Sequence, residues 1–210
     1  NMYYTRLLVP DIRLKKCYVH WIKVKELISA GMWNSISRLS QVLSDGLDLV
    51  ITNIWISAYL MGELSIAQQI PTYISTLTNT LINLFSPNLT MYYAKDDTEA
   101  VVKELKLSMK FSSFFVNIIF CILVIFGKYF MQLWVPNQDV NLIYSLLVVI
   151  MMSLLVSGVT TSLNNVFLVT NRLKVNSIFW LIISFTNVLL VFIFLNTTSL
   201  GIYAVAGVSK

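Results

Sequence analysis

Long apolar runs separated by short polar segments dominate the chain. A helix needs about 20 mostly apolar residues to cross a bilayer, and a sixth run is cut short by the last residue, Lys210. The pattern therefore predicts an all-α, polytopic membrane helical bundle that is a piece of a longer chain. The alternative is that Met2 is the true start and Asn1 an added residue. The expected spans are roughly residues 33–60, 66–92, 107–126, 142–169 and 175–195, followed by the truncated start of a sixth at 201–210.

Composition supports a membrane protein and excludes several other classes. Hydrophobic residues make up 57% of the chain and charged residues 12%, whereas about a quarter of a soluble domain is charged. The net charge of +5 comes from basic residues in small clusters between apolar runs, so we expect no nucleic-acid partner. Cys17, Cys121 and the single His20 form no disulfide framework or metal-binding pattern.

The distribution of Lys and Arg predicts the orientation. All 15 except Arg38, Lys128 and Lys210 lie before the first span, around the connection between the second and third, or between the fourth and fifth. The segments on the opposite side of the membrane hold only Lys128. Because positive charge favours the cytoplasm, the segments expected there are residues 1–30, 94–106 and 170–174.

Residues 1–30 are expected to form a linker that contains an amphipathic helix. Helical spacing puts Trp21 and Ile22 on one side, with Lys16, Lys23 and Lys25 on the other. Such a helix lies at the membrane surface and contacts anionic lipid headgroups. Membrane lipids are therefore an expected partner, and a solvated linker helix is the simpler alternative.

A polar stripe runs along the first span. Its members recur at steps of three and four residues, which places them on one face of a helix. A charged side chain at a helix centre costs about 2.5–3.5 kcal/mol even on the most lenient scale, so this face is expected to meet water or protein. A water-filled pathway fits best, and a buried ion-pair cluster is the alternative. The stripe consists of Asn34, Arg38, Gln41, Asp45, Asp48 and Thr52.

The second and fourth spans carry weaker polar stripes. Hydroxyl and amide side chains recur at the same spacing, and they either line the same pathway or tie neighbouring helices together. The members that we place in the pathway are Thr76, Asn79, Asn83 and Asn164.

No motif for enzyme chemistry is visible. The sequence has no Cys/His metal set, Gly-rich phosphate loop or nucleophile elbow, so we expect no catalytic activity and no bound cofactor. Asp45 and Asp48 lie one helical turn apart near mid-membrane. Two such carboxylates repel unless they share a proton or bind a cation, which predicts coupling to Na⁺ or H⁺.

Several segments resemble bacterial oligosaccharide flippases, the polysaccharide-export branch of the multidrug/oligosaccharidyl-lipid/polysaccharide superfamily. The first polar span, with Gly-Met-Trp-Asn-Ser-Ile-Ser-Arg-Leu-Ser at 31–40 and Asp-Gly-Leu-Asp-Leu-Val-Ile-Thr-Asn at 45–53, resembles their seventh helix. The resemblance extends over nearly the whole chain, and it depends on the order of the motifs. The other similar segments are 85–97, 133–136, 164–174 and 200–209.

The resemblance implies that residues 31–210 are a C-terminal lobe that faces an N-terminal lobe across a polar cavity. Such proteins move undecaprenyl-pyrophosphate-linked oligosaccharides across the bacterial cytoplasmic membrane. The cavity positions that it implies on the first two spans are the stripe residues from Arg38 to Asp48 together with Thr76, Asn79 and Asn83. One Arg and two Asp make this face negative, which departs from what a pyrophosphate needs. A cation-coupled drug antiporter of the same superfamily, or a membrane-embedded glycan polymerase or ligase, is an alternative function.

The orientation makes a testable prediction. A Thr98→Cys variant without Cys17 and Cys121 should resist a membrane-impermeant thiol reagent in intact cells and react in inverted vesicles. Labelling in intact cells only would reverse the topology.

Overall fold

A computed structural model describes residues 20–170, 173–197 and 201–208. These residues form an all-α membrane bundle and contain no strand. Three helices are long and apolar enough to cross a membrane: Thr98–Trp134, the Val140–Phe167 part of α6 and the Lys174–Thr197 part of α7. In chain order the helices are α2 (Trp21–Trp55), α3 (Ala58–Asn83), α4 (Ser86–Ala94), α5 (Thr98–Trp134), α6 (Val140–Val169), α7 (Leu173–Thr197) and α8 (Ile202–Val208).

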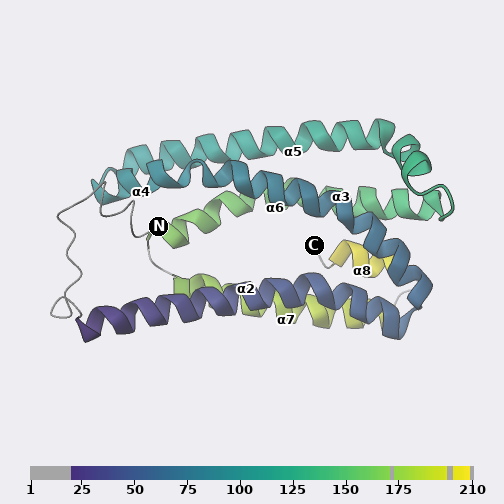
Figure 1. Cartoon of the computed structure of the whole chain (residues 1–210), viewed down its shortest axis with the longest axis horizontal. Coiled ribbons are helices and arrows are strands. Elements are labelled where there is room, and N and C mark those ends of the chain that lie inside the picture. Colours follow the sequence, from purple (N-terminus) through teal and green to yellow (C-terminus); the bar gives the residue numbers. More distant parts are fainter. Residues whose placement is uncertain (1–19, 171–172, 198–200, 209–210) are drawn as a thin grey trace, which may run out of the picture.

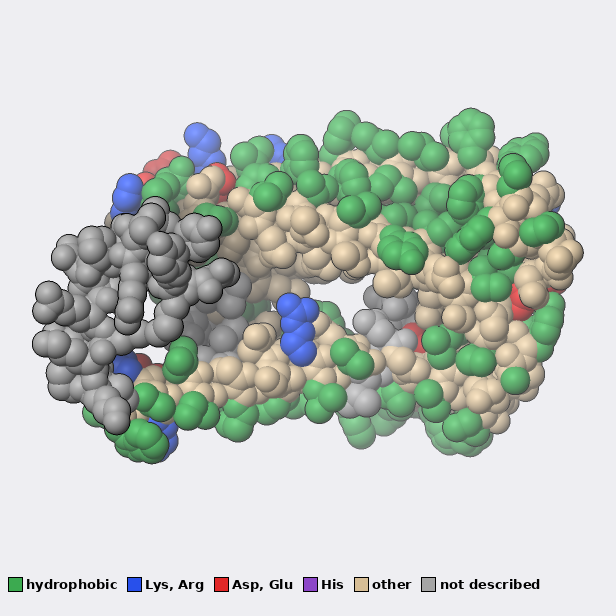
Figure 2. Space-filling view, viewed as in Figure 1, with side chains coloured by type: hydrophobic (Ala, Val, Ile, Leu, Met, Phe, Trp, Pro, Cys, Tyr) green, Lys and Arg blue, Asp and Glu red, His purple; other side chains and the backbone are tan. Residues whose placement is uncertain are grey.

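The long helices run nearly parallel in two layers (Figure 1). Helix α2 packs against α7 in one layer, while α3 and α5 pack against α6 in the other. Helix α3 starts beside the end of α2 and crosses to the second layer, and the short α8 contacts both α6 and α7. Between the layers the surface is hollowed, with open space visible beyond the middle of α2 (Figure 2).

Local capping sets where the helices begin. The side chain of Ser57 accepts a hydrogen bond from the Leu60 amide at 3.1 Å and starts α3. Asp97 accepts one from the Ala100 amide at 2.9 Å and starts α5. These side chains satisfy amides that have no partner within the helix.

The structure corrects the expected boundaries of the first two spans. The first helix ends at Trp55 rather than residue 60, and residues 61–65, expected to be a turn, lie inside α3. Helix α3 then ends at Asn83, and Pro87 lies in the first turn of α4, so the expected 66–92 span is two helices. The physical reason is that Ser57 is an N-cap and that proline is favoured in a first helical turn.

Two polar segments are also more helical than expected. The described part of the 1–30 linker is continuous with α2, which starts at Trp21, and residues 1–19 lie outside the described residues. Helix α5 starts at Thr98 and continues to Trp134, so it includes most of the 94–106 segment and exceeds 107–126 at both ends. The expected 142–169 and 175–195 spans lie within α6 and α7, and α8 covers 202–208 of the sixth run.

Small residues let α5 and α6 approach closely. The hydroxyl oxygens of Ser108 and Ser162 are 3.2 Å apart, and Ser112 donates to the Gly158 carbonyl at 3.1 Å. A Cβ atom placed on Gly158 would come within 3.3 Å of the Val116 side chain. This Ser/Gly seam fits membrane helices, which associate through close packing and short hydrogen bonds.

A second seam joins α2 to α7. Ser177 donates to the Trp33 carbonyl at 2.7 Å, so the Ser37 hydroxyl, 2.7 Å away, donates to Ser177. Ser184 donates to the Ser40 carbonyl at 3.3 Å. The polar atoms of this seam thus face the partner helix, while the outer face of α7 stays apolar, with Phe185 73% exposed.

The α5–α6 seam predicts that Gly158→Val destabilises the protein. Valine would overlap Val116, and overpacking of this kind costs about 1–3 kcal/mol. Gly62→Val in α3 is the matched control, because a Cβ there meets no atom within 4 Å. Thermal unfolding in detergent should show a lower midpoint for the Gly158 variant, and equal midpoints would contradict close packing at this position.

Candidate functional site

The polar stripe of α2 is exposed near the start of the helix and buried near its end. Asn34 and Arg38 are exposed and Gln41 is half-buried. Asp48 is 3% exposed and Thr52 is fully buried, with the Thr52 hydroxyl donating to the Asp48 carbonyl at 2.7 Å. Asp45 lies on α2, but its side chain is outside the described residues.

Arg38 stands apart from the buried end of the stripe. Ten residues of helix separate it from Asp48, a rise of about 15 Å. Within the described part of the chain the one ion pair is Lys23–Glu26, near the start of α2. Arg38 is therefore exposed and separate from the buried end of the stripe.

The polar stripe of α3 is exposed. Thr76, Asn79 and Asn83 are all open to the surface, and the Thr76 hydroxyl donates to its own helix, to the Thr72 carbonyl at 2.9 Å. Asn164 of α6 is half-buried. The expected site residues whose side chains are described thus lie on three separate helices, α2, α3 and α6.

The exposed polar side chains of α2 and α3 limit what can lie beside these helices in a membrane. Polar side chains that face lipid are costly in the middle of a membrane bundle. The exposed side chains of Arg38, Asn79 and Asn83 therefore require water or further protein beside them. Figure 2 shows a hollow between the two layers of the described structure.

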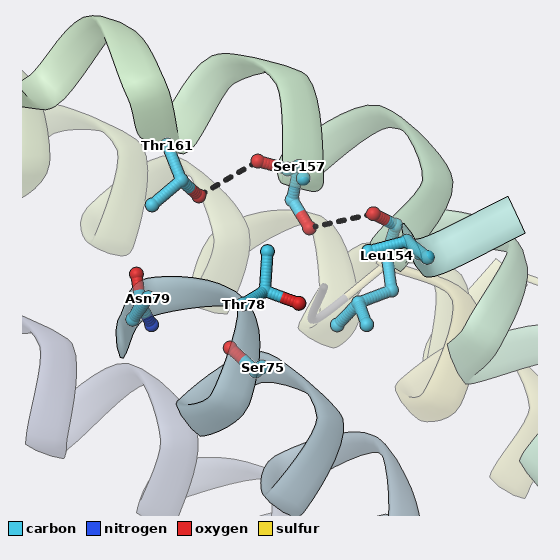
Figure 3. A pocket seen from close by; sticks show the side chains of 8 residues that line it. Ser75, Thr78, Asn79, Leu154, Ser157 and Thr161 are labelled. Atoms are coloured by element: carbon cyan, nitrogen blue, oxygen red, sulfur yellow. Dashed lines mark hydrogen bonds between the residues drawn. The ribbon is translucent and has the colours of Figure 1, made fainter. Parts of the chain in front are cut away.

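A small pocket opens where α3, α5 and α6 meet (Figure 3). The centre of a water molecule can occupy about 10 Å³ of this pocket. The pocket therefore has room for roughly one water molecule. Ser157 and Thr161 of α6 lie across it from the α3 residues. Its polar lining is Ser75, Thr78, Asn79, Ser157 and Thr161, and its remaining lining is Val116, Leu154 and Gly158.

Glu63 is a buried carboxylate that sequence reasoning placed in a turn. It is 1% exposed, and it accepts a long hydrogen bond, 3.4 Å, from the backbone amide of Asp139 at the start of α6. The N-terminus of a helix carries partial positive charge and favours a carboxylate. Glu63 therefore ties α3 to the start of α6. Recognition of Ser57 as an N-cap would have put Glu63 inside a helix.

The described side chains of the polar faces are mostly hydroxyl and amide groups. They include no group of three or more His, Cys, Asp or Glu residues that would hold a metal ion. What the polar faces offer is hydrogen bonding from hydroxyl and amide groups, with Arg38 as an exposed cation.

Comparison with known proteins supports a membrane protein. The chain is 24% identical over 205 residues to the "Uncharacterized membrane protein EpsK" of Bacillus subtilis (strain 168). This similarity covers 98% of the chain and 40% of the relative, so the chain spans about two fifths of that protein's length. No protein-family model and no solved structure matches the chain.

The Glu63 contact predicts a stability effect. Glu63→Leu removes the acceptor for the Asp139 amide and should lower the free energy of unfolding by about 1–3 kcal/mol. Glu63→Gln keeps a carbonyl acceptor and should lose less. Denaturant unfolding in detergent measures both, with Gln69→Leu at an exposed position of α3 as the control. A Glu63→Leu protein as stable as the control would show that this contact does not hold α6.

Proposed function

We propose that the chain is the C-terminal lobe of a flippase that moves lipid-linked oligosaccharides across the bacterial cytoplasmic membrane. The lobe binds and releases its substrate without catalytic chemistry or a bound cofactor. Its partners are the lipid-linked oligosaccharide, membrane lipids and an N-terminal lobe of the same protein. The resemblance of its segments to oligosaccharide flippases supports this proposal, as does the similarity to a membrane protein of about two and a half times its length.

The observation that carries the proposal is the exposed polar face of α3. Thr76, Asn79 and Asn83 are exposed, whereas the outer face of α5 presents side chains such as Phe114, 67% exposed. Neutral amides and hydroxyls match the hydroxyl groups of a sugar, because each side both donates and accepts hydrogen bonds. A helix with this face suits the wall of a sugar pathway.

Arg38 serves the charged part of the same substrate. It is exposed on α2, and a guanidinium binds phosphate oxygens in a bidentate manner. The two carboxylates of the stripe, Asp45 and Asp48, would repel a pyrophosphate unless each is neutralised. We propose that they bind Na⁺ or H⁺, or that cations of the N-terminal lobe compensate for them.

The buried Asp48 favours one second candidate, a cation-coupled multidrug antiporter. A carboxylate that is 3% exposed in a membrane bundle suits the uptake and release of a small cation. The antiporter would not need Arg38, which distinguishes the two functions.

Complementation tests the flippase proposal. The full-length protein should restore surface polysaccharide to cells that lack a repeat-unit flippase, and Arg38→Ala should lower transport about tenfold or more, since hydrogen bonds to charged groups contribute about 1.5–3 kcal/mol. Arg38→Lys should recover part of it. Asp45→Asn and Asp48→Asn should abolish transport at normal protein abundance.

Four outcomes would contradict the proposal or change it. Failure of the wild type to complement contradicts the flippase function, and drug resistance from the same protein would favour the antiporter. Normal polysaccharide from the double Asn variant would remove the carboxylates from the mechanism. Loss of protein along with function would instead give them a structural role.

A further inference from the structure

The hydroxyl protons around the α3–α5–α6 pocket are directed away from it. Thr78 donates to the Ile74 carbonyl at 2.8 Å, and Thr161 donates to the Ser157 carbonyl at 2.7 Å. Ser157 donates to the Leu154 carbonyl at 3.4 Å (Figure 3). Each hydroxyl has a single proton and two lone pairs, so these three oxygens have only acceptor capacity left for the pocket.

The residues at the edge of the pocket differ from its interior in their hydrogen-bonding capacity. Asn79 is exposed and Ser75 is half-buried. The Asn79 amide offers both donors and an acceptor, and a serine hydroxyl rotates to suit its partner. The pocket therefore combines an acceptor-lined interior with an edge that donates or accepts.

Size limits what enters. The recess has room for roughly one water molecule, so of a bound sugar it takes one small polar group. A hydroxyl group fits this size, and it donates to the interior while accepting from the edge. A phosphate oxygen only accepts, and it would face the lone pairs of Thr78, Ser157 and Thr161.

We infer that this pocket binds a single hydroxyl group of the transported sugar and rejects the pyrophosphate. The inference rests on the proposed function and deepens it, because it assigns the sugar to the α3–α6 face. The pyrophosphate then lies elsewhere in the pathway.

A matched pair of α6 variants tests this assignment. Thr160 and Thr161 both donate to the Ser157 carbonyl, but only Thr161 lines the pocket. Thr161→Val and Thr160→Val thus each lose a hydrogen bond to the same carbonyl, and only Thr161→Val changes the pocket. Thr78→Val, with Thr80→Val as its exposed control on α3, repeats the comparison from the other wall.

The binding measurement uses the purified full-length protein and two probes. One is the free oligosaccharide released from the polysaccharide of the complemented cells, and the other is inorganic pyrophosphate. Thr161→Val and Thr78→Val should weaken oligosaccharide binding by about five- to tenfold, the effect of one hydrogen bond, and leave pyrophosphate binding unchanged. The two control variants should bind both probes like the wild type, and all five proteins should share an unfolding midpoint within a few degrees.

The outcomes separate the pocket from the function. If the wild type complements and binds the oligosaccharide but Thr161→Val and Thr160→Val bind it equally, the pocket assignment is wrong and the flippase function stands. Weaker pyrophosphate binding by the pocket variants, or no oligosaccharide binding by a complementing wild type, also overturns the assignment. Failure of the wild type to complement removes the proposed function, and the pocket assignment with it.

Discussion

Each polar group in a membrane bundle needs a partner because lipid provides none, and this constraint governs the arrangement of the helices. Serine hydroxyls of α5, α6 and α7 donate to carbonyls of their own or the adjacent helix at Ser112, Ser113, Ser153 and Ser177. Glu63 reaches the Asp139 amide at the start of α6. Buried exceptions among the described residues include single atoms of Glu63, Gln68 and Asn165. Arg38 and Asn79 are instead exposed on α2 and α3. Because they have no lipid partner, they mark the face on which the protein meets water, substrate or another lobe.

The same constraint explains which helices the sequence predicts well. Helices α6 and α7 hold the expected 142–169 and 175–195 spans because they are apolar throughout, with polar turns beside them. The boundary between helices α2 and α3 is harder to predict, since Gly62 and Glu63 are residues typical of a turn. Only the fold shows that the Glu63 carboxylate has a partner at the start of α6. The charged start of α5 resembles a loop in the sequence, because a helix that extends outside the membrane does not need apolar residues there.

The candidate site is predictable only in part, for a related reason. Spacing identifies the residues that share a face of α2, but it does not reveal which end of that face is covered. Asp48 and Thr52 are buried while Asn34 stays open, and α2 packs against α7, α3 and α8. The pocket likewise needs both α3 and α6. The spacing pattern included Asn79, whereas Ser75 and Thr161 enter only through tertiary packing.

We expect the polar face of α3 to lie beside water and the outer face of α5 beside lipid. Spin labels at Asn79 and Phe114 of the full-length protein in liposomes test this through their accessibility to a water-soluble nickel chelate and to oxygen. The label at position 79 should be relaxed mainly by the chelate and the label at 114 mainly by oxygen. Oxygen-dominated relaxation at both positions would place the α3 face in lipid and contradict this arrangement.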